Sequence, residues 1–412
     1  MTHSVIVSAA RTAIGKFGGA IAHLSAVELG AHAIGGALER AGISGDQVDY
    51  VIMGQVLQAG TGQITARQAA VSAGIPTSVP AITVNKVCLS GLNAIALADQ
   101  LIRAGEVSVV VAGGMESMDQ APYLLPKARQ GYRMGDGKVV DSMVHDGLWD
   151  AFNHRHMGDQ SDDVNAELSI ARSDQDAWSA SSHTRAQQAT EEGRFEQEIV
   201  PIEILQKGRA VGSASAQKRR DPLVFDADEG IRPGTSAESL AKLKPVFQPD
   251  GTITAGNASQ ISNGAAAVVV MSAERAAELG VSPIAEIVAH GMSADEPPYL
   301  HTVPALAIQA ALKKAGLAPG DLDLVEINEA FAAVALHAAR MLFDDDGSAE
   351  AKVNVNGGAV ALGHPIGCSG ARLVVSLVHE LRRRGGGIGA AALCGGGGQG
   401  DALIVRVPAG AS

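Results

Sequence analysis

Ala37-Leu-Glu-Arg-Ala-Gly-Ile-Ser-Gly-Asp-Gln-Val-Asp-Tyr-Val51 aligns without gaps to Ala311-Leu-Lys-Lys-Ala-Gly-Leu-Ala-Pro-Gly-Asp-Leu-Asp-Leu-Val325. In each copy the pattern predicts the end of a helix, a glycine cap, a turn and then a buried strand. The flanking sequence repeats as well, because each copy follows an alanine-rich amphipathic stretch and a short strand, at residues 4–8 and 284–290. We infer that the chain contains two copies of one α/β unit.

A second helix and strand extend the repeat in each half. Cys88-Leu-Ser-Gly91 opens a helical pattern that runs to Arg103 and is followed by a strand pattern. Cys368-Ser-Gly370 opens a similar pattern that runs to Arg384 and is again followed by a strand pattern. Two β-α-β-α-β units about 270 residues apart predict a duplicated α/β fold, with two sets of layers related by a pseudo-two-fold axis.

The segment between the two copies has a different composition. From about residue 118 to residue 248 the chain is more polar and contains both tryptophans. It also carries a basic run, made up of Lys207, Arg209, Lys218, Arg219 and Arg220. We interpret this segment as an inserted domain of helices and loops. The apolar residues 265–271 then predict a strand that returns to the first half, which divides the chain into 1–118 plus 252–275, 119–251 and 276–412.

Composition excludes several classes of protein. The 412 residues carry a net charge of −12, which argues against nucleic acid or an anionic membrane as a partner. Three widely spaced cysteines make neither a disulfide framework nor a zinc site, so we expect no metal. The N-terminus lacks the pattern of a signal peptide, and no apolar run reaches the length of a membrane span. These features predict a soluble, cytoplasmic, multidomain protein.

Cys88 is a candidate nucleophile because of its place in Val84-Asn-Lys-Val-Cys-Leu-Ser-Gly91. The thiol lies where a strand pattern gives way to a helical one, and the free N–H groups and dipole of a helix start favour thiolate. Ser90 and Gly91 are small enough to let a substrate approach the sulfur. The alternative is a small buried hydrophobic residue, which is the usual role of a free cysteine.

Three further loops carry candidate residues. His364 lies in Gly363-His-Pro-Ile-Gly367 and is a candidate general base or oxyanion donor. The alternative is a histidine with only a packing role. Cys394 precedes Gly395-Gly-Gly-Gly-Gln-Gly400, whose backbone N–H groups are available to a reacting oxygen. This run is not a dinucleotide-binding motif, because residues 401–407 predict a strand where that motif needs a helix. Asn328, which ends the repeated strand of the second half, is the third candidate. The alternative is that it only caps the next helix.

These stretches together resemble the thiolase family, and within it the short-chain acetyl-CoA acetyltransferases. The resemblance covers nearly the whole chain. The matching motifs are Ala9-Ala-Arg-Thr-Ala-Ile-Gly15, Asn85-Lys-Val-Cys-Leu-Ser-Gly91, Gly113-Gly-Met-Glu-Ser-Met118, His156-Met-Gly158, Ala255-Gly-Asn-Ala-Ser259, Asn328-Glu-Ala-Phe331, the His364 loop and the Cys394 loop. It implies a five-layered α-β-α-β-α fold, duplicated, with an inserted loop domain.

The resemblance also implies a role for each candidate residue. Cys88 matches the nucleophile that carries the acyl group as a thioester, and His364 matches the histidine that activates it. Cys394 matches the cysteine that exchanges a proton with the α-carbon of acetyl-CoA. Asn328 matches the residue that positions a water in one oxyanion hole, and the backbone N–H groups of Cys88 and Gly396 match the other. The implied reaction is a ping-pong Claisen condensation of two acetyl-CoA to acetoacetyl-CoA and CoA, and its reversal.

Coenzyme A is then a substrate and product, and no permanently bound cofactor is expected. By resemblance the insert binds CoA, with Arg220 and then Arg219 as candidate phosphate contacts, unless these arginines only form a solvated face. Ser259 resembles a residue that contacts the pantetheine arm. His156 and Met157 resemble the loop that shapes a short acyl pocket.

Two departures from the family pattern stand out. Leu89 replaces a smaller residue beside the nucleophile, and Cys368 adds a thiol near the His364 loop that is open to oxidation, although a packing role fits it better.

Two alternative functions share the same motifs. A broad or long-chain 3-ketoacyl-CoA thiolase of fatty-acid β-oxidation would keep every catalytic residue and differ in its acyl pocket. A non-catalytic acyl-CoA-binding protein would keep the fold, but the joint presence of the four candidate side chains speaks against it. A decarboxylating ketoacyl synthase would not need Cys394 as a base. The resemblance further implies a role in fatty acid metabolism and a homotetramer built as a dimer of dimers.

Overall fold

The computed structural model describes residues 3–204, 222–343 and 347–410. The first half consists of β1 (Ser4–Arg11), β2 (Gly15–Lys16), α1 (Ala26–Ala41), β3 (Tyr50–Gly54), α2 (Thr65–Ser72), β4 (Ala81–Val84), α3 (Ser90–Arg103), β5 (Val109–Ser117) and β12 (Ser262–Ser272). The second half, after α8 (Ala273–Leu279), consists of β13 (Ala285–Ala294), α9 (Val303–Ala315), β14 (Leu324–Ile327), α10 (Ala332–Leu342), α11 (Ser348–Lys352), α12 (Ala359–Leu362), α13 (Ile366–Arg383), β15 (Gly387–Gly395) and β16 (Gln399–Val407).

The repeat is visible in both the helix ends and the sheet. Helices α1 and α9 end at Gly42 and Gly316, whose φ angles of 66° and 70° are left-handed and favour glycine. The strand orders match as well, because β4-β3-β5-β12-β1 in the first half corresponds to β14-β15-β16-β13 in the second. The place of β4 is taken in the second half by a single parallel bridge from Val325 to Val353. A short antiparallel pairing of β1 with β13 joins the two sets into one sheet.

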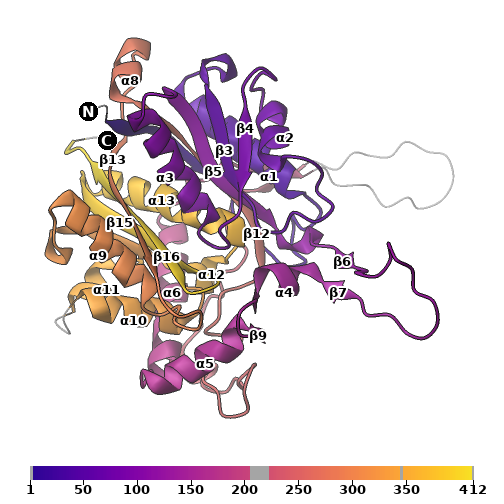
Figure 1. Cartoon of the computed structure of the whole chain (residues 1–412). Coiled ribbons are helices and arrows are strands. Elements are labelled where there is room, and N and C mark those ends of the chain that lie inside the picture. The colour runs from indigo at the N-terminus through magenta and orange to yellow at the C-terminus, as the bar shows by residue number, and fades with distance from the viewer. Residues whose placement is uncertain (1–2, 205–221, 344–346, 411–412) are drawn as a thin grey trace.

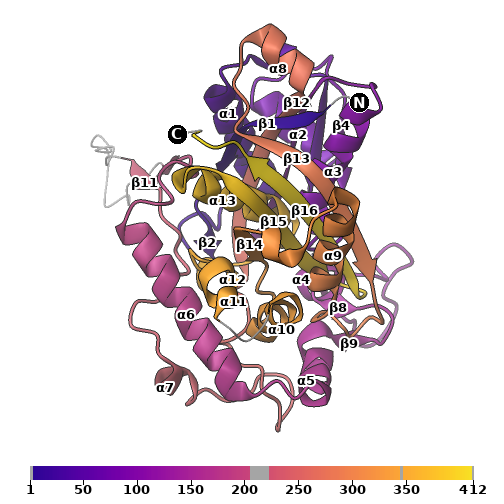
Figure 2. The same ribbon diagram turned by 90° about the vertical axis from the view of Figure 1, so that its left-hand side faces the viewer.

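Helices cover and separate the two halves of the sheet, giving the expected five layers. Helices α1 and α2 cover the outer face of the first half, and α9 and α10 cover that of the second. Helices α3 and α13 pack against each other between the two strand sets (Figures 1 and 2). Three separate apolar clusters fill the outer and central interfaces. As a result, the N-terminal ends of α3 and α13, which belong to opposite halves, are brought close together.

Between β5 and β12 the inserted segment is less regular. It contains α4 (Ser142–Gly147), α5 (Met157–Glu167), α6 (Arg172–Glu191), α7 (Ala237–Leu240) and three two-stranded pairs, β6 (Tyr123–Leu124) with β7 (Val140–Asp141), β8 (Trp149–Asp150) with β9 (Arg155–His156), and β10 (Ile202–Ile204) with β11 (Leu223–Phe225). The hairpins add to the helices and loops expected there. Helix α6 packs on α10 and α12, so the insert leans on the second half.

The return of the chain to the first half follows the expected pattern. Strand β12 covers the predicted residues 265–271 and lies between β1 and β5. β16 begins directly after the glycine run, where the dinucleotide motif would need a helix. Among the described residues, no helix is long and apolar enough to span a bilayer.

Candidate active site

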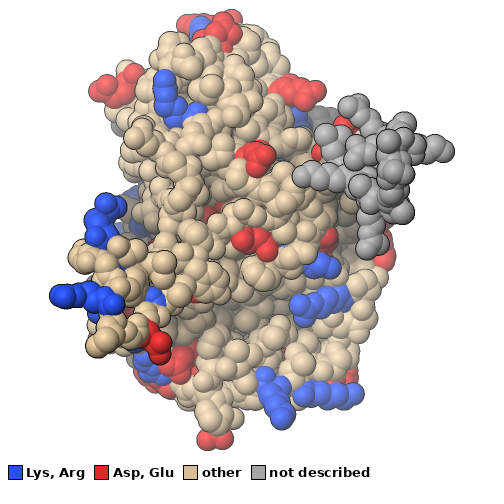
Figure 3. All heavy atoms as spheres, turned by 90° about the vertical axis from the view of Figure 1, so that its right-hand side faces the viewer, with Lys and Arg blue, Asp and Glu red and all other residues tan. Residues whose placement is uncertain are grey.

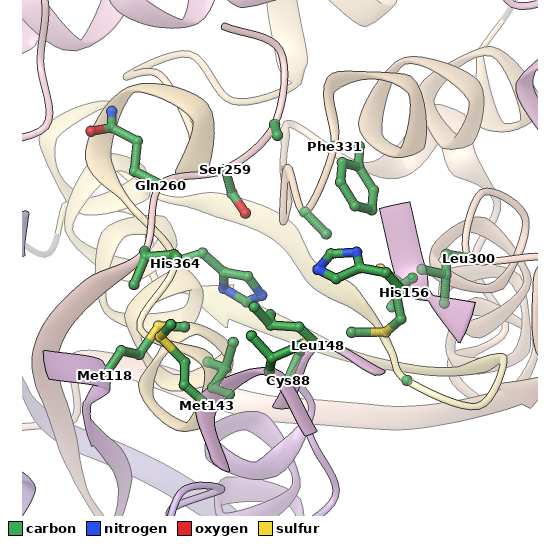
Figure 4. A pocket seen from close by; sticks show the side chains of 18 of the residues that line it. Cys88, Met118, Met143, Leu148, His156, Ser259, Gln260, Leu300, Phe331 and His364 are labelled. Carbon is green, nitrogen blue, oxygen red and sulfur yellow. The ribbon is translucent and has the colours of Figure 1, made fainter. Parts of the chain in front are cut away.

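A cavity of about 320 Å³ opens where the N-terminal ends of α3 and α13 meet the insert. The cavity is lined mostly by apolar side chains. Three candidate catalytic side chains also line it: Cys88, His364 and Cys394. Figure 4 shows the imidazoles of His364 and His156 on either side of this cavity, with Cys88 below and between them. The apolar part of the wall is formed by Met118, Met143, Val144, Leu148, Met157, Val246, Phe247, Ala258, Ile261, Leu300, Ala330, Phe331 and Ile366.

The turn before α3 holds Cys88 in a fixed position. Val87, the preceding residue, has a φ of +51°, which is a strained conformation for a β-branched residue. Hydrogen bonds on both sides stabilise this turn: the Val87 N–H donates to the Asn85 side chain (3.0 Å), and the Ser90 hydroxyl donates to the Val87 carbonyl (2.6 Å). Backbone strain of this kind is typical of turns at functional sites. The turn positions the Cys88 thiol at the cavity.

The protonation state of Cys88 differs from the sequence-based interpretation. A helix start was expected to favour thiolate, but burial raises the pKa of Cys88 to about 12. Backbone N–H groups of Cys88 and Gly396 oppose this rise, because both donate toward the sulfur. The two backbone donors act in the expected direction, but the desolvation of a buried thiolate outweighs them. In this state the Cys88 side chain is a thiol, and to act as a nucleophile it would need a base.

His364 has the hydrogen-bond partners of such a base. Its Nδ1 lies 2.6 Å from the Ser369 hydroxyl oxygen, which is 3.0 Å from the Pro365 carbonyl, and its Nε2 lies 3.4 Å from Asn328 Nδ2. In the assigned orientation of the Asn328 amide, its nitrogen donates and Nε2 accepts. The three contacts are satisfied together when Nδ1–H donates to Ser369 and the hydroxyl donates to Pro365. Burial lowers the pKa of His364 to about 3, which keeps the imidazole neutral.

Asn328 is held at the end of β14, behind the cavity wall. Its N–H donates to the Ala392 carbonyl at 3.0 Å. Its side-chain oxygen is buried and has no partner among the described residues, which suits it to accept a hydrogen bond from a water or ligand. The alternative reading as a helix cap is wrong, because α10 begins at Ala332 with Phe331 as its cap.

Glu329 fixes this loop, although the sequence singled it out only as part of the motif Asn328-Glu-Ala-Phe331. Its carboxylate accepts hydrogen bonds from the Trp178 indole (2.9 Å), the Ser182 hydroxyl (2.8 Å), the Val360 N–H (3.0 Å) and the Asn354 amide (3.0 Å). These donors come from the insert and from the second half. Glu329 therefore anchors the neighbour of Asn328 to two parts of the fold.

Glu116 makes the corresponding connection between the two halves. Its buried carboxylate accepts from the N–H groups of Val56 (3.0 Å), Leu57 (3.2 Å) and Gly367 (3.0 Å). Burial raises its pKa to about 7, against these three donors. Gly367 lies in the first turn of α13, so this one side chain joins the loop after β3 to the loop that carries His364. Only its place in a matching motif singled out Glu116 in the sequence.

Cys394 lies at the end of β15 and is almost fully buried. Burial raises its pKa, and the neighbouring Cys88 adds to the effect. Leu89 packs directly against Gly395, where an added Cβ would lie 2.7 Å from the Leu89 Cγ. The departure at position 89 therefore shapes the surroundings of Cys394. Cys368 is also buried but does not line the cavity, which agrees with a packing role.

The remaining binding candidates fall into two groups. His156, Met157 and Ser259 all line the cavity. The His156 ring caps α5 by accepting from the Gly158 N–H (3.0 Å) and stacks on Phe247, with ring centroids 4.5 Å apart.

Arg219 and Arg220 lie outside the described residues, with the rest of the basic run, so their phosphate contact stays a prediction. On the face in Figure 3, Lys and Arg side chains gather in the lower half with carboxylates among them, despite the net charge of −12. No group of three or more possible metal ligands occurs within the described ranges.

Comparison with known proteins gives a consistent result. Two family models, described as "Thiolase, N-terminal domain" and "Thiolase, C-terminal domain", match residues 4–274 and 281–407. The chain is 55% identical over 406 residues to a probable acetyl-CoA acetyltransferase of Mycobacterium tuberculosis, and 51% identical over 406 residues to an acetyl-CoA acetyltransferase of Cupriavidus necator, covering 98% of this chain and 100% of each relative. The crystal structure of the Bacillus anthracis acetyl-CoA acetyltransferase is 42% identical, with 99% of both chains covered and a TM-score of 0.92.

Proposed function

The chain belongs to the thiolase family, and from that membership we propose that it is an acetyl-CoA C-acetyltransferase. It condenses two acetyl-CoA to acetoacetyl-CoA and CoA, and it catalyses the reverse thiolysis. The relatives at 50–55% identity named acetyl-CoA acetyltransferase favour this activity over a long-chain thiolase or a non-catalytic binding protein. The observation that carries the mechanism is the convergence of Cys88, His364 and Cys394 on one cavity.

The first half-reaction transfers an acetyl group to Cys88. His364 Nε2 takes the thiol proton as the sulfur attacks the thioester carbonyl, and the C–S bond to CoA breaks. The departing CoA thiolate takes a proton from Cys394 and leaves as the thiol. This ordering suits the high pKa of Cys88, because the base acts as the bond forms. We propose that the backbone N–H groups of Cys88 and Gly396 bind the thioester oxygen, and their donation toward the Cys88 sulfur supports this role.

The second half-reaction forms the carbon–carbon bond. The Cys394 thiolate takes a proton from the α-carbon of a second acetyl-CoA, and the resulting carbanion attacks the acetyl group on Cys88. The Cys88 thiolate then leaves and recovers its proton from the imidazolium of His364, so the enzyme returns to its starting state. His364 and a water positioned by Asn328 stabilise the negative charge that develops on the thioester oxygen of the second acetyl-CoA. A buried, apolar cavity strengthens each of these interactions.

Substrate binding is proposed for two sets of side chains: those that line the cavity, and the arginines that lie outside the described residues. We propose that Ser259 contacts the pantetheine arm and that Arg219 and Arg220 contact the CoA phosphates. His156 and Met157, together with the rigid stack on Phe247, limit the acyl pocket to short chains. The protein then needs CoA only as substrate and product.

The domain division and assembly are also proposals. Residues 1–118 plus 252–275 and residues 276–412 form the two halves, and residues 119–251 form the CoA-binding insert. The pairing of β12 with β1 and β5 supports this division. The β6–β7 segment projects from the body (Figure 1) and exposes Met134 to 98% together with Tyr123 and Leu125, which supports a homotetramer. A cytoplasmic location and a role in fatty acid metabolism complete the proposal.

Thiolysis tests the function directly. Purified protein is given CoA with acetoacetyl-CoA or with a C16 3-ketoacyl-CoA, alongside Cys88→Ala and the matched variant Cys368→Ala. We expect cleavage of the C4 substrate alone, lost in Cys88→Ala and kept in Cys368→Ala. Equal or faster cleavage of the C16 substrate would move the protein to the degradative class. Cleavage of neither by folded protein would favour the binding-protein alternative.

A further inference from the structure

Asp401, in β16, is a fully buried carboxylate that takes no part in the proposed chemistry. In the pairing of β15 with β16, Cys394 lies opposite Gly400 and Leu393 lies opposite Asp401, so the carboxylate is one step along the ladder from Cys394. Asp401 does not line the catalytic cavity. Its side chain instead leaves the hairpin of β15 and β16 and reaches the first half of the fold.

Two side chains of the first half donate to this carboxylate. Lys86 Nζ lies 2.8 Å from Oδ1, and Asn93 Nδ2 lies 3.2 Å from Oδ2. His290 Nε2 is 3.7 Å from Oδ1, which is beyond hydrogen-bond distance, so Lys86 is the counter-ion. Asp401 therefore ties the β15–β16 hairpin both to the loop before α3 and to the first turn of α3.

The two donors lie on either side of Cys88 in the sequence. Lys86 is part of the strained turn, because its N–H donates to the Ser90 hydroxyl (2.8 Å) and its carbonyl accepts from the Leu89 N–H (3.2 Å). Asn93 follows in the first turn of α3. A carboxylate bonded at both places fixes the segment that carries the Cys88 thiol.

The hairpin that Asp401 joins to this segment carries other groups of the candidate site. Cys394 lies in β15, and the Gly396 N–H in the following turn donates toward the Cys88 sulfur. Neither the charge of Asp401 nor that of Lys86 is among the causes of the raised pKa of Cys88. An effect of Asp401 on Cys88 therefore has to act through position and not through charge.

A buried ion pair is a poor means of gaining stability, because taking the Asp401 carboxylate out of water costs free energy that apolar side chains of similar volume do not lose. What the pair adds is direction, since a charge-assisted hydrogen bond fixes the distance and angle between its two groups. We propose that Asp401 is a positioning residue, which acts through Lys86 to hold the turn of Cys88 against the β15–β16 hairpin. This role rests on the proposed acetyltransferase activity.

Thiolysis of acetoacetyl-CoA by Asp401→Asn tests the role. The amide keeps the size of the side chain but loses the charge to which both donors bond. A displacement of about 1 Å at a reacting group costs up to about a hundredfold in rate, so we expect kcat to fall about tenfold to a hundredfold while KM stays within about threefold. Asp99→Asn is the matched control, because it removes another buried carboxylate that accepts from Arg103 (2.7 Å), farther along α3. The control should keep its kcat.

A double-mutant cycle shows whether Asp401 acts through Lys86. Lys86→Met removes the counter-ion, and the double variant removes both charges. Residues that work as one unit should give a double variant whose kcat is no lower than that of the slower single variant, within about threefold. Reductions in kcat that multiply would show independent effects and would overturn the proposal.

Amide hydrogen exchange separates this role from the proposed function. In Asp401→Asn, exchange in the peptide of residues 84–92 should speed up about tenfold or more, and in Asp99→Asn it should not. A wild type without thiolysis would refute the acetyltransferase activity, and hydrogen exchange would still decide whether Asp401 holds the turn. Unchanged exchange in Asp401→Asn, a wild-type kcat or a rise in KM alone would refute the positioning role.

Asn93→Ala keeps the proposal testable should Asp401→Asn fail to fold. It truncates a partly exposed side chain and leaves the pair of Lys86 and Asp401 intact. Loss of one hydrogen bond to the carboxylate should lower kcat about threefold or more at an unchanged KM. Wild-type kcat in this variant would then count against the role of Asp401.

Discussion

Ser369→Ala is expected to slow turnover without changing the fold. The Ser369 hydroxyl lies 2.6 Å from His364 Nδ1, and both groups are buried. Its loss leaves a buried N–H without an acceptor and favours the other tautomer, in which Nε2 carries the proton and cannot accept one from Cys88. An unpaired buried donor costs about 1–3 kcal/mol, which corresponds to a fall of roughly 5- to 150-fold in kcat.

Steady-state thiolysis of acetoacetyl-CoA measures this effect. Ser376→Ala is the matched control, because it removes another buried hydroxyl from the same helix. The Ser376 hydroxyl donates to the Glu198 carboxylate at 3.2 Å and does not contact His364. The control should keep its kcat, and both variants should keep KM within a few-fold. A Ser369→Ala enzyme with wild-type kcat and an unchanged pH profile would refute the tautomer assignment.

Three other predictions test the energetics of the site. With a pKa near 3, His364 stays neutral between pH 8 and pH 5.5, so kcat/KM should not fall as the pH is lowered through this range. A fall in kcat/KM with a midpoint near pH 6.5 would show that His364 titrates normally. Glu116→Ala leaves three backbone N–H groups unpaired and should lower the free energy of unfolding in urea by about 3 kcal/mol or more, and a loss below about 1 kcal/mol would contradict its role in joining the halves. Leu89→Ala should destabilise by about 2–5 kcal/mol in the same assay and slow the step assigned to Cys394, unless the surroundings of Gly395 collapse to fill the space.

Much of the fold was predictable because it depends on local signals. Gly42 and Gly316 mark helix ends through a left-handed conformation that few other residues adopt, and each precedes an apolar strand at the same spacing. Because these signals occur twice, the sequence predicted a duplicated fold. Boundaries were less certain: α13 begins at Ile366, two residues before the expected start at Cys368, because Pro365 already fixes the chain for a helix there.

The supporting residues of the site could not be predicted in the same way. Glu116 contacts Gly367, which is 251 residues away, and Glu329 contacts Trp178 across 151 residues. No local pattern records such partners. The pKa of Cys88 was misjudged for a related reason, because the helix start is visible in the sequence but the depth of burial is not. The resemblance named Cys88, His364 and Cys394, which line the cavity, and only the fold identifies the residues that hold their loops.

The packing of α3 against α13 makes the candidate site depend on both copies of the repeat. Cys88 precedes α3 in the first half, and His364 precedes α13 in the second half. A thiol and its base on opposite copies cannot react within a single unit. In the proposed mechanism, therefore, neither copy of the repeat is sufficient, and the contact between α3 and α13 is what completes the site.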